Sequence, residues 1–292
     1  MVVARLSELA HTPAFADAAR VLFPKERLDA FARSTGVDLR DTPTGVAAGF
    51  DYATLFLAET SGDDRNVEAR FVDRLLVLAS RSERAGMSRV TGIVGQTPES
   101  LVRAEGQFVA VSVGDPSLAR VVELLALGRM DRVPPALRGS ALSTLPRDLE
   151  AAPLRFYAPG PFSGEWARGA RGLFAAALAI GVAAEPTPSG LRLKAVLSGD
   201  WSGQDVARLA SSWADLAESA LGRLLGLDQP ISQPEVTLAQ QTLTLTVVVA
   251  LRPLASGLEA AVAADVWKLL GGPGPPPPGN EGAGTPGRPS TP

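Results

Sequence analysis

The feature that most constrains the fold is a similarity between the two halves of the chain. "AFADAARVLF" at 14–23 aligns with "EWARGARGLF" at 165–174, an offset of 151 residues, and "GVAA" at 45–48 returns at 181–184, an offset of 136. Two further matches share an offset of 137: "SGD" at 61–63 and 198–200, and Pro116 and Pro253, each expected to open a helix. Because the matches keep their order and the later offset is nearly constant, they indicate an ancient duplication.

Hydrophobic periodicity predicts similar elements in each half. In "TLTLTVVVAL" apolar residues alternate with threonines, which is the period of a strand. The predicted strands are 2–5, 45–50, 53–59, 89–94, 107–113, 154–158, 182–186, 190–198, 234–239 and 242–251. The predicted helices are 13–33, 65–80, 116–128, 164–180, 203–225 and 253–269. This order favours an α+β fold of two β-α-β-β-α-β-β-α halves, with antiparallel or mixed sheets, helices on one face, and a relation to ferredoxin-like units.

The predicted organisation has four parts. The first α+β repeat covers 1–129, a proline-bearing connecting segment covers 130–153, and the second repeat covers 154–270. The end, 271–292, is nearly all glycine, proline and small polar residues, a composition typical of disorder. The sequence leaves open whether the halves share one sheet or form two domains.

Composition excludes several chemistries. The 292 residues contain no cysteine, which rules out disulfides, zinc–thiolate sites and cysteine nucleophiles. The net charge of −3 does not give the basic face that nucleic-acid binding requires. No apolar run reaches the roughly 18 residues of a membrane helix. We expect a cytoplasmic protein, or a periplasmic or envelope-associated one if the native start lies upstream of Met1.

Two serines have the surroundings of candidate nucleophiles, Ser202 in "SGDWSGQD" and Ser163 in "GPFSGEW". Their spacing is G-x-x-S-G, whereas a nucleophile elbow is G-x-S-x-G. A serine nucleophile also needs a base, and the one histidine, His11, precedes an expected helix start. Helix capping accounts better for both serines, with Asp205 completing a capping box after Ser202 and Glu165 following Ser163.

Other motifs have structural explanations as well. "TGIVGQTPESLVR" at 91–103 lacks the lysine of a phosphate-binding loop, and Thr97 with Pro98 predicts a helix start; Asp115 before Pro116 repeats that pattern. The acidic groups Glu59/Asp63/Asp64 and Asp38/Asp41 do not have the spacing of a calcium loop and indicate solvated turns. An exposed helix face is expected for Glu68, Arg70, Asp73, Arg74, Arg81, Glu83 and Arg84. Core packing is expected for Trp166, Trp201, Trp213 and Trp267, with an aromatic binding groove as the alternative.

The Ala/Arg/Leu/Gly/Pro-rich composition, the duplicated unit and the proline-rich end resemble uncharacterised secreted or lipoprotein-type proteins of GC-rich bacteria. This resemblance covers most of 1–270 and carries no motif of known chemistry, so we expect no catalytic, cofactor-binding or metal-binding residues and no cofactor. The sequence favours a non-enzymatic interaction or structural protein, with a partner protein as its ligand. The alternatives are a binder of an apolar or lipid-like ligand between the halves and, more remotely, a serine hydrolase.

Overall fold

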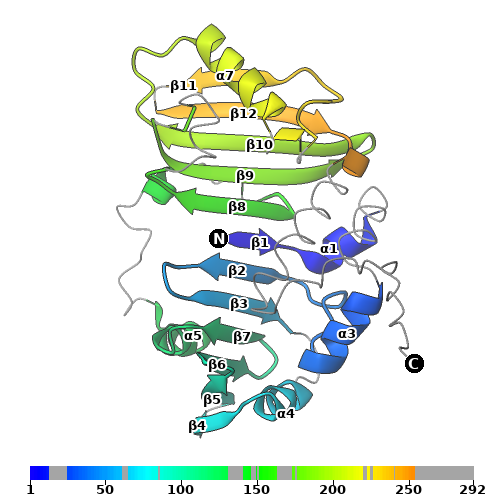
Figure 1. Cartoon of the computed structure of the whole chain (residues 1–292), viewed down its shortest axis with the longest axis vertical. Coiled ribbons are helices and arrows are strands. Elements are labelled where there is room, and N and C mark those ends of the chain that lie inside the picture. Colours follow the sequence, from blue (N-terminus) through cyan, green and yellow to red (C-terminus); the bar gives the residue numbers. More distant parts are fainter. Residues whose placement is uncertain are drawn as a thin grey trace, which may run out of the picture.

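The structure is a computed structural model, shown in Figure 1. It describes residues 1–12, 25–60, 65–84, 86–130, 141–145, 149, 151–162, 173–174, 176–219, 222–223, 226–239 and 241–253. These residues form an α+β fold in which one twelve-stranded sheet carries a small number of helices. All paired strands in it are antiparallel.

The strands come from both predicted halves. The first half contributes β1 (Val2–Ala4), β2 (Gly45–Gly49), β3 (Thr54–Glu59), β4 (Val77–Arg84), β5 (Met87–Val94), β6 (Thr97–Ala104) and β7 (Phe108–Val113). The second half contributes β8 (Leu154–Pro159), β9 (Ala177–Thr187), β10 (Gly190–Gly199), β11 (Glu235–Ala239) and β12 (Thr242–Val249). The described helices are α1 (Leu6–His11), α3 (Lys25–Thr35), α4 (Arg65–Asp73), α5 (Ser117–Ala126), α7 (Val206–Glu218) and the 3₁₀ turn η2 (Ala141–Thr144).

The two halves share this sheet. Its strand order is β11-β12-β10-β9-β8-β1-β2-β3-β7-β6-β5-β4, so the halves meet where β1 pairs with β8. Outward from that pair, the first half runs β1, β2, β3, β7, β6 and the second runs β8, β9, β10, β12, β11. The β5–β4 hairpin extends the first half beyond this common order.

Helices cover both faces of the sheet, which corrects the expectation that they lie on one face. Adjacent residues of a strand point to opposite faces, and in β6 Leu101 packs with α4 whereas Val102 packs with α5. We call these the α4/α7 face and the α5 face. In the second half α7 packs on the α4/α7 face, and Leu145 and Leu149 of the connecting segment pack against Ala183 and Val196 of the α5 face. A sheet whose two faces are both apolar needs a cover on each side.

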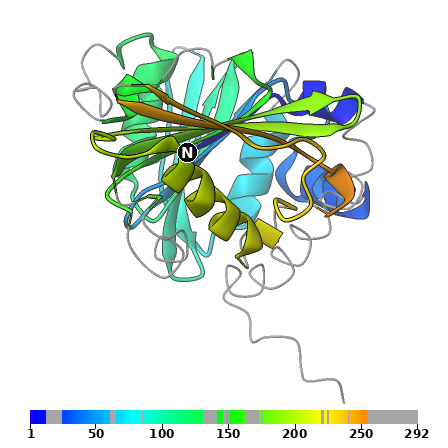
Figure 2. The same ribbon diagram turned by 90° about the horizontal axis from the view of Figure 1, so that it is seen from above.

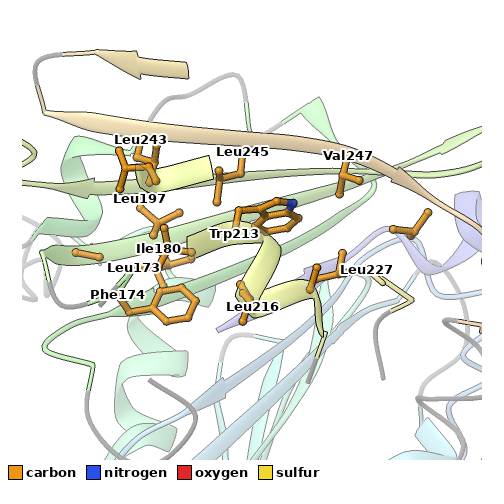
Figure 3. Close-up of a cluster of buried hydrophobic side chains, with 14 of the residues drawn as sticks. Leu173, Phe174, Ile180, Leu197, Trp213, Leu216, Leu227, Leu243, Leu245 and Val247 are labelled. Carbon is orange, nitrogen blue, oxygen red and sulfur yellow. The ribbon is translucent and has the colours of Figure 1, made fainter. Parts of the chain in front are cut away.

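The largest core lies between α7 and the strands of the second half (Figures 2 and 3). Leu209, Trp213 and Leu216 form the apolar stripe of α7, as the helical spacing predicts, and all three are buried. They pack on alternate residues of β10 and β12, among them Leu197 and Leu243.

Three predicted elements were wrong in part. The helix predicted over 65–80 ends at Asp73, and Val77–Arg84 forms β4. The helix start predicted at Thr97 is the first residue of β6, which continues from β5 through a tight turn at Gly95 (φ +62°). Residues 177–180, predicted as helix, begin β9. In each of these segments the residue types favour a helix or a helix start. Hydrogen bonding to a neighbouring strand overrides this local preference.

Other predictions fall partly outside the described residues. These include 13–24 and 164–172 of two predicted helices, 254–269 of the helix predicted to open at Pro253, and the tail at 271–292. Residues 251–253 are helical, so the predicted strand ends at Val249 and the helix does not open at Pro253. Where it can be compared, the helix predicted over 116–128 is confirmed as α5, and 25–33 lies within α3.

Candidate functional site

A row of apolar side chains crosses the centre of the sheet on the α4/α7 face. Strand register aligns Phe56 of β3, Ala47 of β2, Val2 of β1, Phe156 of β8 and Val182 of β9. Directly paired residues project from the same face, and strands are about 4.8 Å apart, so the row spans roughly 19 Å. We call these five residues the central row.

The middle of the central row is open to solvent. Phe56 is 50% exposed, Phe156 43% and Val2 36%. These large side chains project from interior strands of the sheet, positions where a two-layer fold buries apolar residues. Phe56, Val2 and Phe156 belong to none of the core clusters formed by the described residues.

The same row is covered at both ends. Beyond Phe56 it continues through Val111 to Leu101, which pack in the cluster with α4. Beyond Val182 it continues through Ala195 to Leu245, which belong to the α7 cluster. Figure 1 shows why: α7 lies over one end of the sheet and α4 lies at the other, with β8, β1 and β2 between them.

The side chains of the central row can contact a ligand only through apolar surface. It contains two phenyl rings, two valines and one alanine, with no side chain that donates or accepts a hydrogen bond. Exposed apolar side chains that adjoin one another, in contrast to scattered ones, are typical of surfaces that bind a partner or an apolar ligand. The row lies at the junction of the halves, and the sequence analysis missed its residues because their alignment depends on the strand order.

Ser202 lies in a turn before α7 and does not cap the helix itself. Its backbone N–H and its Oγ donate to Asp200 Oδ1 at 3.0 and 2.6 Å, and these bonds lower the pKa of Asp200. The N-cap of α7 is Asp205, whose carboxylate accepts from the N–H of Ala207 at 3.3 Å. The capping box predicted from Ser202 is therefore wrong, because Asp205 is itself the N-cap, whereas Ser163 lies outside the described residues.

His11 has no catalytic partner in the part of the chain that the structure describes. It is the last residue of α1, and its Nδ1 lies 2.6 Å from the carbonyl oxygen of Ser7. The helix expected to start after it, at residue 13, lies outside the described residues. Asp115 accepts hydrogen bonds from the N–H and the Oγ of Ser117, at 2.8 and 2.7 Å, which lower its pKa. The helix α5 thus begins at Ser117, one residue after Pro116, and Asp115 stabilises its first turn.

The acidic clusters are partly ion-paired, partly exposed, as Asp41 and Glu59 are, and partly outside the described residues. Asp38 accepts from the Nε and Nη2 of Arg40 at 2.8 and 2.6 Å, and Arg40 also contacts Asp29 of α3 at 2.9 Å. This pairing lowers the pKa of Asp38, so the segment is an ion-paired turn. Asp63 and Asp64 are outside the described residues. Over the described ranges no three histidine or acidic side chains gather in a way that would hold a metal ion.

The charged residues expected on one exposed helix face lie on α4, on β4 and, for Arg74, in the turn between them. Glu68 of α4 is buried, and its carboxylate contacts Arg81 of β4 at 2.6 Å and Arg103 of β6 at 3.8 Å. Arg74 lies 3.5 Å from Glu99 of β6, whose pKa is raised by burial. The charges therefore attach α4 to the sheet, which corrects the expectation of a solvated helix face.

Core packing is confirmed for two tryptophans. Trp201 and Trp213 are 3% and 8% exposed, and Trp201 Nε1 donates to the carbonyl of Leu197 at 3.2 Å. Trp166 and Trp267 lie outside the described residues.

Comparison with known proteins gives structural similarity only. Neither a protein-family model nor a curated protein sequence matches the chain. Crystal form III of TP0453 is 10% identical and covers 89% of this chain and 93% of its own, with a TM-score of 0.49. Crystal form I is also 10% identical, covering 89% and 92%, with a TM-score of 0.47. None of the helices in the described ranges combines the length and the apolar character that crossing a membrane requires.

Proposed function

We propose that this chain is a non-enzymatic interaction protein and that the central row is its contact surface. The observation that carries this proposal is the exposure of Phe56 and Phe156 on two interior strands, β8 at the junction of the halves and β3, which β1 and β2 separate from it. The two side chains lie in one register row, separated by Ala47 and Val2, so a partner can contact both at once. Each phenyl ring is already about half buried, so burial of the remainder in a complex contributes about 1 kcal/mol per ring.

A second candidate is a lipid-like ligand bound along the same row. The absence of polar side chains in the row favours it, because a protein partner usually finds hydrogen bonds at the rim whereas an acyl chain needs none. The row length of roughly 19 Å suits an extended hydrocarbon chain. Packing of Trp213 between the halves would have closed such a site. Trp213 is instead buried in the core of the second half.

Site-specific photo-crosslinking tests both candidates. Phe56 is replaced in the full chain by a photoreactive phenylalanine analogue, and the matched control places the analogue at Leu125, which is 44% exposed on α5. We expect adducts from position 56 and none of the same species from position 125. A protein adduct supports the interaction function and a lipid adduct, found by mass spectrometry, supports the second candidate. Equal labelling at both positions, or no adduct at position 56, contradicts a binding role for the central row.

A serine hydrolase is the alternative with the least support. Ser202 Oγ donates to a carboxylate, and Asp200 supplies no imidazole base. Labelling of the chain by a serine-directed probe that disappears in Ser202→Ala would restore this alternative.

We infer further that the halves arose by duplication of an α+β unit related to ferredoxin-like folds, as the sequence matches suggest. The common strand order on the two sides of the β1–β8 pair supports the inference. A role at a bacterial cell envelope, expected from the resemblance to lipoprotein-type chains, is part of the same proposal. Fractionation of cells that express the protein from its native gene tests it, and recovery in the soluble cytosolic fraction alone would contradict it.

A further inference from the structure

The strand β4 forms one edge of the sheet, and no other strand of the described residues pairs with its outer side. All eight of its residues are exposed, and Arg81–Arg84 follow a β-bulge between Leu78 and Ser80. The hairpin that β4 forms with β5 has no counterpart in the strand order of the second half. A free edge presents unpaired N–H and C=O groups, which is a template for another strand.

Hairpin geometry indicates which residues direct their backbone groups to the free edge. Arg84 pairs with Met87 across a tight turn that contains Gly86 (φ +73°). Because antiparallel pairs alternate, Arg84, Ser82 and Ser80 exchange hydrogen bonds with β5, whereas Glu83 and Arg81 direct their N–H and C=O groups away from it. A second strand must therefore pair through Arg81 and Glu83.

We propose that β4 pairs antiparallel with β4 of a second copy of this chain, forming a two-fold dimer with a continuous sheet. In the register that the charges favour, Arg81 lies opposite Glu83 of the second copy, and Glu83 lies opposite Arg81 of the second copy. The other registers that join outward-facing residues place Arg81 opposite Arg81 or Glu83 opposite Glu83. Opposite charges across a pair stabilise it and like charges destabilise it, so the order of charges selects one register.

The side chains that this register pairs, those of Arg81 and Glu83, are both exposed. Glu83 has no hydrogen bond or ion pair within the described part of the chain, and Arg81 is 61% exposed although it also contacts Glu68. Arg81 would then lie between two carboxylates. Val77 and Leu78, which are 52% and 50% exposed, come next to the β4–β5 turn of the second copy and lose exposed apolar area there. Ser82 lies on the two-fold axis, opposite Ser82 of the second copy.

Ser82, which lies on the two-fold axis, provides a direct test. The unsubstituted chain has no cysteine, so any disulfide must come from an introduced cysteine. Non-hydrogen-bonded antiparallel pairs have Cα atoms about 4.5 Å apart, which is within disulfide range. The variant Ser82→Cys of the full chain should form a disulfide-linked dimer under mild oxidation. The control Ser80→Cys should not, because two such residues are four positions out of register, about 14 Å apart. Thermal unfolding of both reduced variants should match the unsubstituted chain.

A charge substitution tests the register independently of any disulfide. The variant Glu83→Arg places two arginines opposite each other at both symmetric positions and should weaken dimerisation at least about tenfold in sedimentation equilibrium. The matched control is Glu105→Arg, the same charge change in the exposed β6–β7 turn, which should leave the dimer intact.

The proposal would be overturned by a monomer for the unsubstituted chain at about 100 μM, by equal cross-linking of the Ser82→Cys and Ser80→Cys variants, or by equal dimerisation of the two arginine variants. Assemblies larger than a dimer would indicate pairing of β4 with the other edge, β11, and would also overturn the two-fold register.

Discussion

Truncation of Leu149 tests the cover that the connecting segment provides on the α5 face. Leu149 is 1% exposed and packs with Ala183 and Val196 of the sheet. The substitution Leu149→Ala removes three carbon atoms, at about 0.8 kcal/mol each, and leaves a cavity that the sheet cannot close. We expect a loss of about 3–4 kcal/mol in the free energy of unfolding, which lowers Tm by roughly 10 °C.

Gly181 of β9 provides a second measurement of the same contact. A Cβ at this position would lie 2.6 Å from Leu149 Cδ1 and 3.2 Å from Leu145 Cδ1. The substitution Gly181→Ala alone therefore overpacks the contact and should cost about 1–3 kcal/mol. When Leu149 is also alanine, the nearest obstructing methyl group is absent, so the double variant should be more stable than additivity predicts by about 1 kcal/mol.

The assay is urea denaturation of the four proteins, followed by far-UV circular dichroism. Leu127→Ala is the control for loss of the same atoms at a site that is 42% exposed, and it should change stability by less than about 0.5 kcal/mol. If Leu149→Ala matches this control, or if the effects of the two substitutions simply add, the connecting segment does not cover the sheet at this point.

Three further substitutions test other parts of the fold. Burial raises the pKa of Glu99, so the folded state binds this proton more tightly than the unfolded state, and stability falls as pH rises through the interval between the two pKa values. Glu99→Gln should raise Tm at pH 7 and leave it unchanged below about pH 4, where the natural carboxyl is protonated; an equal effect at both pH values would contradict this. Trp213→Ala should cost about 3–5 kcal/mol in urea denaturation, because its side chain fills the core under α7, and a loss below about 1 kcal/mol would contradict that packing. Gly114→Ala should destabilise by more than about 1 kcal/mol in the same assay, since φ is +96° and a Cβ would lie 2.2 Å from Tyr52 O, so a neutral result would exclude this backbone conformation.

The strands with strong alternation could be predicted closely from the sequence. The prediction of 242–251 corresponds to β12, and 107–113 corresponds to β7, because branched and apolar residues alternate along each segment. The helix α7 could be predicted because its apolar residues recur at helical spacing. Segments whose residues favour a helix although they pair as strands, such as the alanine-rich start of β9, could not be assigned from local pattern.

The candidate site also combines features that the local sequence predicts with features that depend on the strand order. Alternation alone indicates that Phe56 and Phe156 lie on strands, but not that they share a row, because 100 residues separate them and two strands lie between. The spacing arguments against a catalytic Ser202 needed only the local sequence, and its hydrogen bonds to Asp200 agree with a turn. The contacts of Glu68 could not be predicted from the local sequence, because both arginines that contact it come from other elements, β4 and β6.

By itself, then, the amino-acid sequence determined the α+β class, the absence of cysteine chemistry and the periodic strands and helices. These properties depend on residue types and on spacing within a few residues. Only the tertiary structure decided that the halves share one sheet, that helices cover both faces, and that an apolar row remains open between α4 and α7. Backbone hydrogen bonding between strands is insensitive to which apolar side chains they carry, so strand order and register depend on how the whole chain buries its apolar surface.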